Sequence, residues 1–191
     1  MGFDSLHIQD FEVAEQKDAA ELYELQLRAF ESEAEMIGSR NVPALMETYD
    51  ENLRDFRNWT VLIVRNENHE IIGAVRYMEG NDHIEIGRLM VAPEYRNQGI
   101  ASQLLTAVER RTQANVFELY TCTKSHINIR LYEKLGYKKY LEKQGDQELS
   151  FAYMRKVLDQ SPQDDRIEFT LTVTDTDTWD ELFAQTFTYR P

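Results

Sequence analysis

One stretch of the chain combines residue types that suit the binding of an anion. Residues 89–101 read LMVAPEYRNQGIA, so an apolar strand end is followed by a loop with one glycine, Gly99, and by the small residues Ala101 and Ser102 at the start of a helix. The first N–H groups of a helix lack internal partners and lie at the positive end of its dipole. A phosphate docks there when no large side chain blocks the backbone, and Arg96 adds a charge-assisted donor. The segment predicts a phosphate-binding turn; the alternative is an ordinary strand-to-helix turn with a surface arginine.

Other phosphate and metal motifs are absent from the sequence. No Gly-Lys-Ser/Thr follows the turn, which excludes a P-loop, and the single Gly99 excludes a dinucleotide fingerprint. Cys122 is the one cysteine, so the chain has neither an internal disulfide nor a CxxC or Cys/His finger spacing. We therefore expect no metal site, and we interpret Cys122 as a small buried residue rather than as a nucleophile.

A second segment places polar groups on a short helix. Residues 125–137 read SHINIRLYEKLGY, in which Ser125 is a candidate N-cap and Gly136 a candidate C-cap. Asn128 lies near the helix start, and Tyr132 shares its helical spacing with apolar neighbours. The pattern therefore leaves two interpretations for each residue: a ligand contact, or a polar helix start for Asn128 and a packing tyrosine for Tyr132.

Together the two segments resemble the GNAT superfamily of N-acetyltransferases. Val91-x-Pro93-x-x-Arg96-x-x-Gly99-Ile100-Ala101 matches that family's acetyl-CoA pyrophosphate motif, R/Q-x-x-G-x-G/A, with alanine at the last position. Residues 128–137 match a second family motif, which runs from an asparagine to Y-E-K-x-G-F/Y. The resemblance covers roughly residues 5–157. It implies the GNAT α/β fold, a mixed sheet in which two parallel strands splay apart to admit acetyl-CoA.

The resemblance also implies which residues hold the cosubstrate, acetyl-CoA. The pantetheine arm is expected to pair with the backbone of one strand end, and the pyrophosphate to lie on the turn. Asn128 is expected to donate a hydrogen bond to the cofactor, and the Tyr132 phenol to approach its sulfur. The full set of expected cofactor contacts is Leu89, Met90, Val91, Arg96, Asn97, Gln98, Gly99, Ile100, Ala101, Ser102, Asn128 and Tyr132.

Acetyl transfer to an amine needs a base, an oxyanion donor and an acid. A lysine-like ammonium has a pKa near ~10.4 and must lose a proton before attack, the tetrahedral oxyanion needs a donor, and the departing thiolate needs a proton. Glu85 is the candidate base, because several family members carry a catalytic glutamate on this strand; a solvent-facing carboxylate is the alternative. His83 shares the face of Glu85 if the strand is regular, and could assist. Tyr132 is the candidate acid.

The rest of the chain reads as a mixed α/β domain that positions these segments. Apolar residues at helical or alternating spacing define the elements. We expect helices over residues 18–35, from Pro43 to Phe56, 100–113 and 125–135, and strands near Leu6 to Phe11 and over residues 59–65, 71–78, 83–91, 116–123, 137–141 and 149–157.

The charge distribution excludes several functional classes. The formal net charge is −13, with 34 acidic against 21 basic residues; residues 1–58 carry −9, residues 59–157 carry +2 and residues 158–191 carry −6. This balance is unlike the basic footprint of nucleic-acid binding or of a polybasic membrane patch. The first ten residues, MGFDSLHIQD, do not resemble a secretory signal. We expect a cytoplasmic protein without nucleic-acid or membrane partners.

The last segment, residues 158–191, is predicted to be an acidic C-terminal extension of the GNAT acetyltransferase domain at residues 1–157. Apolar and polar residues alternate over residues 167–174, which predicts a strand. Thr178 and Glu181 have capping-box spacing, which predicts a short helix after them. An added strand needs a sheet edge, either in the same sheet or in a second subunit, so a homodimer is one expected outcome.

The functional hypothesis is acetyl transfer from acetyl-CoA to a primary amine of a small cationic molecule, directly within a ternary complex. Acidic helices at the N-terminal end, with Glu21 to Glu35 as candidate contributors, suggest the cationic acceptor. Two alternatives stay open: a non-catalytic acyl-CoA sensor or interaction module of the same fold, and a protein N-terminal or lysine acetyltransferase. Residues 118–123 read ELYTCT and depart from the L-E-V-R segment common in ribosomal-protein N-terminal acetylases, which favours a small molecule.

Overall fold

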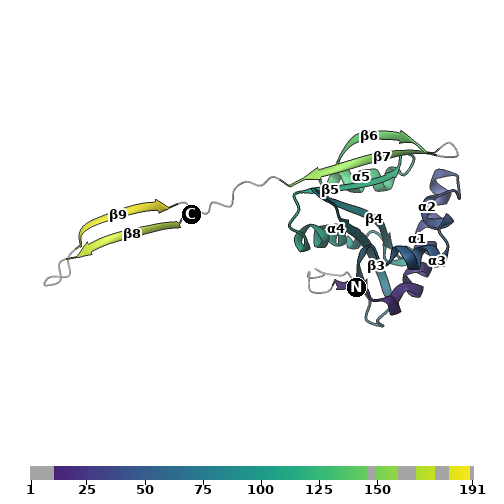
Figure 1. Cartoon of the computed structure of the whole chain (residues 1–191), viewed down its shortest axis with the longest axis horizontal. Coiled ribbons are helices and arrows are strands. Elements are labelled where there is room, and N and C mark those ends of the chain that lie inside the picture. Colours follow the sequence, from purple (N-terminus) through teal and green to yellow (C-terminus); the bar gives the residue numbers. More distant parts are fainter. Residues whose placement is uncertain (1–10, 146–148, 159–166, 175–180, 190–191) are drawn as a thin grey trace. The chain divides into compact units, whose positions relative to one another are not determined.

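The fold comes from a computed structural model that describes residues 11–145 and 149–158, together with the backbone of residues 167–174 and 181–189 (Figure 1). The chain divides into two compact units, residues 1–158 and 159–191. Each unit is described by itself. The strand expected at Leu6 begins outside the described residues.

A seven-stranded mixed sheet forms the centre of the first unit. Its strand order is β1-β2-β3-β4-β5-β7-β6, and every neighbouring pair is antiparallel except β4 and β5. The prediction of a mixed sheet is therefore confirmed. The strands are β1 (Glu12–Val13), β2 (Thr60–Arg65), β3 (Ile71–Glu79), β4 (Ile84–Val91), β5 (Val116–Cys122), β6 (Lys138–Gln144) and β7 (Ser150–Val157).

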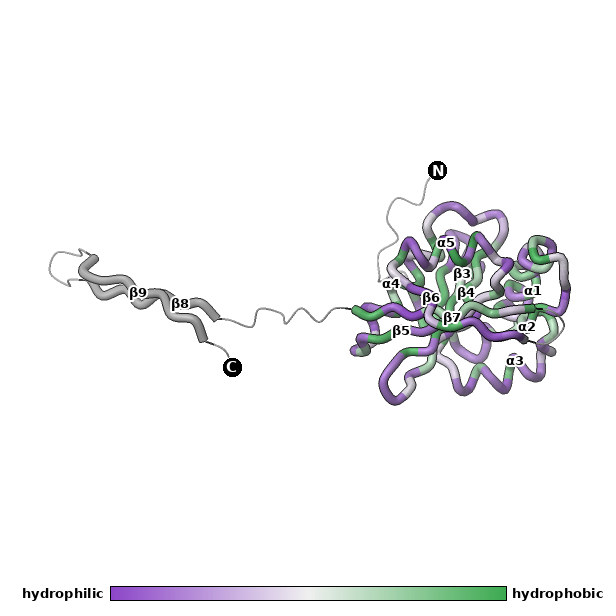
Figure 2. Tube along the Cα trace, turned by 90° about the horizontal axis from the view of Figure 1, so that it is seen from above, coloured by the Kyte–Doolittle hydropathy of each residue, from purple (hydrophilic) through white to green (hydrophobic). Residues whose placement is uncertain are grey.

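Helices cover both faces of this sheet (Figure 1). Apolar side chains of α1 (Ala19–Ile37) pack on one face against Val61, Ile63 and Met90. Apolar side chains of α4 (Ile100–Arg111) and α5 (His126–Lys134) pack on the other face, in a larger cluster with the strands. The hydropathy colouring shows the same layering, with hydrophobic strands inside and more hydrophilic outer segments (Figure 2).

The single helix predicted from Pro43 to Phe56 is wrong. The structure has two short helices, α2 (Pro43–Met46) and α3 (Tyr49–Asp55), separated by two extended residues, Glu47 with φ −66° and ψ 127° and Thr48 with φ −79° and ψ 161°. Thr48 accepts a hydrogen bond from the Glu51 amide, and the Glu51 carboxylate in turn accepts from the Thr48 amide. This reciprocal capping box begins a new helix. The break places the Glu47 carboxylate near two arginines of β3 and β4, described below.

The two parallel strands, β4 and β5, pair only at their first residues. Ile84 pairs with Phe117 and Glu85 with Glu118, and the described ladder contains no further pair between these strands. From Ile86 onward, β4 therefore has backbone groups on its β5 side without a strand partner. Backbone N–H and C=O groups seek hydrogen bonds, so this wedge is a ready place for an extended ligand.

A β-bulge re-aims the side chains of β4 next to the wedge. Ala74 pairs with Met90 and Arg76 with Gly87, so Arg88 and Leu89 together lie opposite one residue of β3. Arg88 has φ 47°, an uncommon backbone conformation for a residue other than glycine. Bulges frequently occur beside active sites, where they redirect a side chain. Here the bulge turns Arg88 toward the face of the sheet that α1 covers.

The second unit contains an antiparallel hairpin of β8 (Ile167–Thr174) and β9 (Glu181–Tyr189). The strand expected over residues 167–174 coincides with β8. The short helix expected after Thr178 is wrong, because a strand occupies this segment from Glu181 onward. Consecutive residues of β9 pair with those of β8, from Ile167 with Tyr189 to Val173 with Phe183. This strand pairing, and not the local capping signal, determines the conformation of the segment.

Among the described residues, no helix is both long and apolar enough to cross a membrane.

Candidate active site

Two cavities meet beside the wedge between β4 and β5. The larger, with a volume of about 690 Å³, lies between the turn before α4, the end of α1 and the start of α5. The smaller, about 100 Å³, lies between α1, the start of α2 and the face of the strands. Four residues line both cavities: Phe30, Glu33, Leu89 and Asn128. The larger cavity has the size of a small-molecule site. The smaller cavity adjoins it, at the place where the reacting end of a ligand bound in the larger cavity would lie.

The turn before α4 presents unpartnered backbone amides to the larger cavity. Gly99 is the N-cap of α4 with φ 82°, a conformation that glycine adopts without steric cost. In the described chain, the first amide of α4 with a backbone acceptor is that of Gln103, which donates to the Gly99 carbonyl. Asn97 also has a positive φ, 60°, and lines the cavity with Gly99, Ala101 and Ser102. The free amides and the positive helix end together favour a phosphate here.

The Arg96 side chain lies at the same turn but is largely committed to the protein. Its guanidinium donates to the Ala29 carbonyl at 2.8 Å, to the Ser32 hydroxyl at 2.6 Å and to the Val91 carbonyl at 3.3 Å. These bonds tie the loop to α1 and to the end of β4. Arg96 therefore fixes the shape of the turn, and the backbone amides carry most of the expected phosphate contact.

Tyr132 is held rigidly at the inner end of the cavities. The α5 helix ends in a Schellman motif: the Gly136 amide donates to the Glu133 carbonyl and the Tyr137 amide to the Tyr132 carbonyl. The Tyr137 ring packs edge-on against the Tyr132 ring at 6.0 Å. Burial, with the nearby Glu33 charge, raises the pKa of the Tyr132 phenol. The phenol therefore stays protonated over the working pH range and is able to donate a proton.

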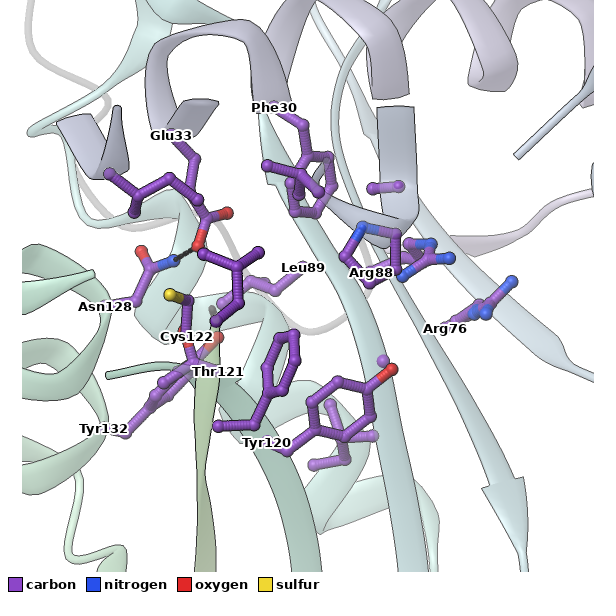
Figure 3. A pocket seen from close by; sticks show the side chains of 18 of the residues that line it. Phe30, Glu33, Arg76, Arg88, Leu89, Tyr120, Thr121, Cys122, Asn128 and Tyr132 are labelled. Atoms are coloured by element: carbon purple, nitrogen blue, oxygen red, sulfur yellow. Dashed lines mark hydrogen bonds between the residues drawn. The ribbon is translucent and has the colours of Figure 1, made fainter. Parts of the chain in front are cut away.

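Glu33 is a further candidate functional residue, which the sequence indicates only as part of the acidic region from Glu21 to Glu35. It projects from α1 to the junction of the cavities, where its carboxylate accepts a hydrogen bond from the Asn128 amide at 3.4 Å (Figure 3). Burial raises the pKa of Glu33, and the contacts with Ser125 and Asn128 and the charges of Arg88 and Arg96 oppose this rise. A carboxylate whose pKa is raised in this way is suited to accept a proton.

The raised pKa of Glu33 predicts a stability effect of its removal. The folded protein binds the Glu33 proton more tightly than the unfolded chain does. Ionisation of Glu33 therefore begins to cost stability above the ordinary pKa of a glutamate side chain, and the cost is complete above the pKa of the folded state. We expect Glu33→Gln to raise the melting temperature near pH 8 and to give no such gain below pH 4. Thermal unfolding at both values measures this, with Glu35→Gln, on the exposed side of α1, as the control. A Glu33→Gln protein less stable than wild type at pH 8 would contradict the burial of an unfavourable charge.

Two other acidic side chains of α1 are engaged elsewhere. Glu21 accepts from the Ile71 amide at 2.6 Å and Glu31 forms an ion pair with Arg40. Between Glu21 and Glu35, Glu33 is the acidic residue that lines a cavity in the described part of the chain. Of the acidic side chains of α1 that were expected to attract a cationic acceptor, Glu33 is therefore the one placed to do so.

Two arginines lie on the opposite wall of the smaller cavity. Arg76 projects from β3 and Arg88 from the bulge of β4, and both face the interior across from Glu33 (Figure 3). Glu85, the candidate base, lines this cavity with Gly87. His83 lies at the β3–β4 turn, where it contacts Asp82 at 2.8 Å, and it is not among the lining residues of either cavity.

The other expected cofactor contacts divide into two groups. Leu89 and Val91 line the larger cavity, as do Arg96, Asn97, Gly99, Ile100, Ala101, Ser102 and Asn128; Tyr132 lines the smaller one. Met90 is buried against α1, and neither Met90 nor Gln98 is among the lining residues of the two cavities. Only the backbone of Met90 is therefore available to a cofactor. Cys122 is buried in a small apolar cluster while it lines the smaller cavity.

Comparison with known proteins gives a family for this arrangement. Residues 19–137 match the model of the acetyltransferase (GNAT) family. UPF0157 protein YqkA of Bacillus subtilis is 26% identical over 122 residues; the match covers 63% of this chain and 35% of YqkA. The chain thus corresponds to about a third of that relative.

Two solved structures show the same fold. The ribosomal-protein-S18-alanine N-acetyltransferase from Escherichia coli is 16% identical with a TM-score of 0.64, over 80% of this chain and 96% of that one. The PaiA N-acetyltransferase from Thermoplasma acidophilum, in complex with coenzyme A, is 17% identical with a TM-score of 0.60, over 77% and 98%. The motif-bearing turn, the splayed strands and the family match agree: through residues 19–137, the chain belongs to the acetyltransferase (GNAT) family.

Proposed function

We propose that the protein transfers the acetyl group of acetyl-CoA directly to a primary amine of a small molecule within a ternary complex. The observation that carries this is the meeting of the two cavities at Glu33, Leu89 and Asn128. The larger cavity offers a diphosphate-binding turn, and the smaller one offers proton-accepting groups and a phenol. A thioester that extends along the unpaired edge of β4 would place its carbonyl between them.

The chemistry assigns a part to each residue. The acceptor arrives as an ammonium, and Glu85 or Glu33 takes its proton, directly or through water. The free amine attacks the thioester carbonyl, the C–S bond breaks, and Tyr132 gives a proton to the departing thiolate. The nitrogen, now bonded to the acetyl carbon, loses its second proton, which returns to the Tyr132 phenolate directly or through water. The backbone amides on the open edge of β4 are the nearest candidates for the donor to the oxyanion.

The test is an acetylation assay of the full chain with a panel of primary amines. Release of the CoA thiol and the mass of the product, recorded together, separate transfer from slow hydrolysis. An amine that gains 42 Da with stoichiometric thiol release supports the proposal; this increment is that of replacing one hydrogen by acetyl. Tight CoA binding with no acetylated product from any amine, peptide or protein would instead identify a non-catalytic binding module.

Glu85→Gln is expected to lower kcat most at low pH. At low pH the acceptor is almost entirely ammonium and depends on the base, whereas at high pH a growing fraction is already neutral. A general base contributes about 10²- to 10⁴-fold. Rate profiles of wild type, Glu85→Gln and Glu33→Gln between pH 6 and pH 10 assign the base to whichever variant shows the larger acid-side loss. A Glu85→Gln profile that superimposes on wild type would remove Glu85 from the mechanism.

The compartment and the assembly are part of the same proposal. We place the protein in the cytoplasm, as the composition suggests, and we propose a homodimer in which the C-terminal extension takes part. Light scattering on the full chain and on a chain that ends at residue 158 tests the second point. If particles of the full chain and of the shortened chain contain the same number of chains, the part proposed for the extension is contradicted.

A further inference from the structure

The smaller cavity contains two arginines whose charge is only partly compensated. The side chains of Arg76 and Arg88 are 15% and 14% exposed. The Nε atom of each is buried and has no hydrogen-bond partner in the described chain. Buried donors of this kind are costly and require an explanation. In addition, burial and the charge of Arg88 lower the pKa of Arg76, as expected for two cations held close together.

Glu47, the carboxylate between the two arginines, is committed to other partners. Its Oε2 accepts from the Gln26 amide at 2.7 Å and from the Asn52 amide at 3.2 Å. Its oxygens lie 3.6 Å from Arg88 Nε and 3.8 Å from Arg76 Nη1, longer than ordinary hydrogen bonds. The second acidic neighbour of Arg76, Asp55, is 44% exposed at 3.5 Å. The pair therefore has room for one more anionic partner.

The protein holds both guanidinium groups in place before any ligand arrives. Arg76 stacks on the Trp59 ring, with Cζ 4.5 Å from the ring centroid. A Cβ at Gly87 would lie 3.3 Å from Arg76 Nε, so glycine leaves the space that this side chain crosses. Arg88 owes its direction to the bulge and its positive φ. Strain of this kind is typical of a functional site.

Glu33 and the arginine pair occupy opposite walls of one cavity (Figure 3). The wall that contains Glu33 adjoins the larger cavity, which we assign to acetyl-CoA. An ammonium group beside Glu33 would therefore lie near the thioester. A guanidinium forms planar, bidentate bonds with a carboxylate, and the volume of about 100 Å³ admits only a small group. We propose that the acceptor is an amino-acid-like amine whose carboxylate binds Arg76 and Arg88 while its amine faces Glu33. This inference rests on the proposed function and names the substrate class for the same site.

Matched pairs of acceptors test the inference. Each pair consists of an amino carboxylate and its carboxamide, with α-, β- and γ-amino acids to vary the spacing, and spermidine represents the polyamines. A charge-assisted pair contributes about 1.5–3 kcal/mol, so we expect kcat/KM about 10- to 100-fold higher for the best carboxylate than for its carboxamide. Equal values for the two members of every pair, or a preference for spermidine, would overturn the inference and leave the proposed acetyl transfer intact.

Arg88→Gln removes one guanidinium without adding a charge. We expect it to raise KM for the carboxylate acceptor about tenfold or more, to leave KM for acetyl-CoA near the wild-type value, and to reduce the carboxylate preference to about twofold or less. Arg110→Gln, at the exposed end of α4, is the matched control and is expected to behave as wild type. Arg88→Lys keeps the positive charge, so we expect its KM for the carboxylate acceptor to lie between those of wild type and Arg88→Gln. It takes the place of Arg88→Gln if that variant does not fold.

Binding without turnover separates this inference from the proposed function. Calorimetric titration of the amino carboxylate into protein saturated with CoA reports a dead-end complex that needs no chemistry. Carboxylate-selective binding that Arg88→Gln weakens supports the inference even if no acetylated product forms, which would defeat the proposed function alone. Absence of binding together with turnover of a carboxamide would defeat the inference alone.

Discussion

Replacement of Ala101 by aspartate is expected to weaken CoA binding about 100-fold or more while the free protein keeps or gains stability. Ala101 lies in the first turn of α4 and lines the larger cavity. A carboxylate at this position satisfies the same free amides that the diphosphate needs, and repels the diphosphate itself. Juxtaposed like charges cost several kcal/mol, and about 1.4 kcal/mol corresponds to a factor of ten.

The same substitution is expected to stabilise the folded protein, whereas it weakens CoA binding. An acidic side chain in the first helical turn stabilises the helix by about 0.3–1 kcal/mol. Calorimetry with CoA and thermal unfolding of the free protein measure the two effects separately. Ala101→Asn is the control of nearly the same shape without the charge, and we expect its CoA affinity to fall much less. If Ala101→Asp binds CoA as well as wild type, the diphosphate does not lie on this turn.

Removal of the Tyr132 hydroxyl is expected to give the second large effect, a loss of kcat of about 100-fold or more with little change in KM for acetyl-CoA. A positioned general acid contributes about 10²- to 10⁴-fold, and Tyr132→Phe keeps the ring that packs against Tyr137. Because burial raises the pKa of Tyr132, we expect the wild-type rate to show no loss of this acid up to about pH 10.

Tyr137→Phe is the matched control for that experiment. Tyr137 is also a buried tyrosine, but its hydroxyl donates to Glu109 at 3.4 Å and it is not a lining residue of either cavity. We expect Tyr137→Phe to lose some stability and to keep its kcat. Steady-state kinetics of both variants decide the matter: a fully active Tyr132→Phe enzyme would make Tyr132 a packing residue.

The parts of the site that follow local rules could be predicted from the sequence. A glycine at a strand-to-helix turn and small residues after it predict free amides, and the structure presents them to a cavity. Gly136 predicts the end of α5, and a Schellman motif is there with φ 93° at this residue. Each of these signals depends on a few consecutive residues, so no tertiary contact is needed to read them.

The acceptor side depends on tertiary contacts that no local pattern contains. Glu33 is one of several carboxylates on α1, and only the packing of α1 beside α5 selects it. The direction of Arg88 depends on a bulge whose positive φ falls on Arg88 itself and not on the neighbouring Gly87, so the sequence pattern does not predict it. The break after α2 is different, because Thr48 and Glu51 form a capping box that the sequence displays. The apolar spacing from Pro43 to Phe56 concealed it.

We infer that the wedge between β4 and β5, together with the turn at Gly99, binds acetyl-CoA. The most direct test is a calorimetric titration of CoA into the wild-type chain, repeated with Ala101→Asp. We expect one binding site per chain in the wild type and a much weaker one in the variant. A wild-type titration without heat at several temperatures, with no change in melting temperature when CoA is added, would contradict it.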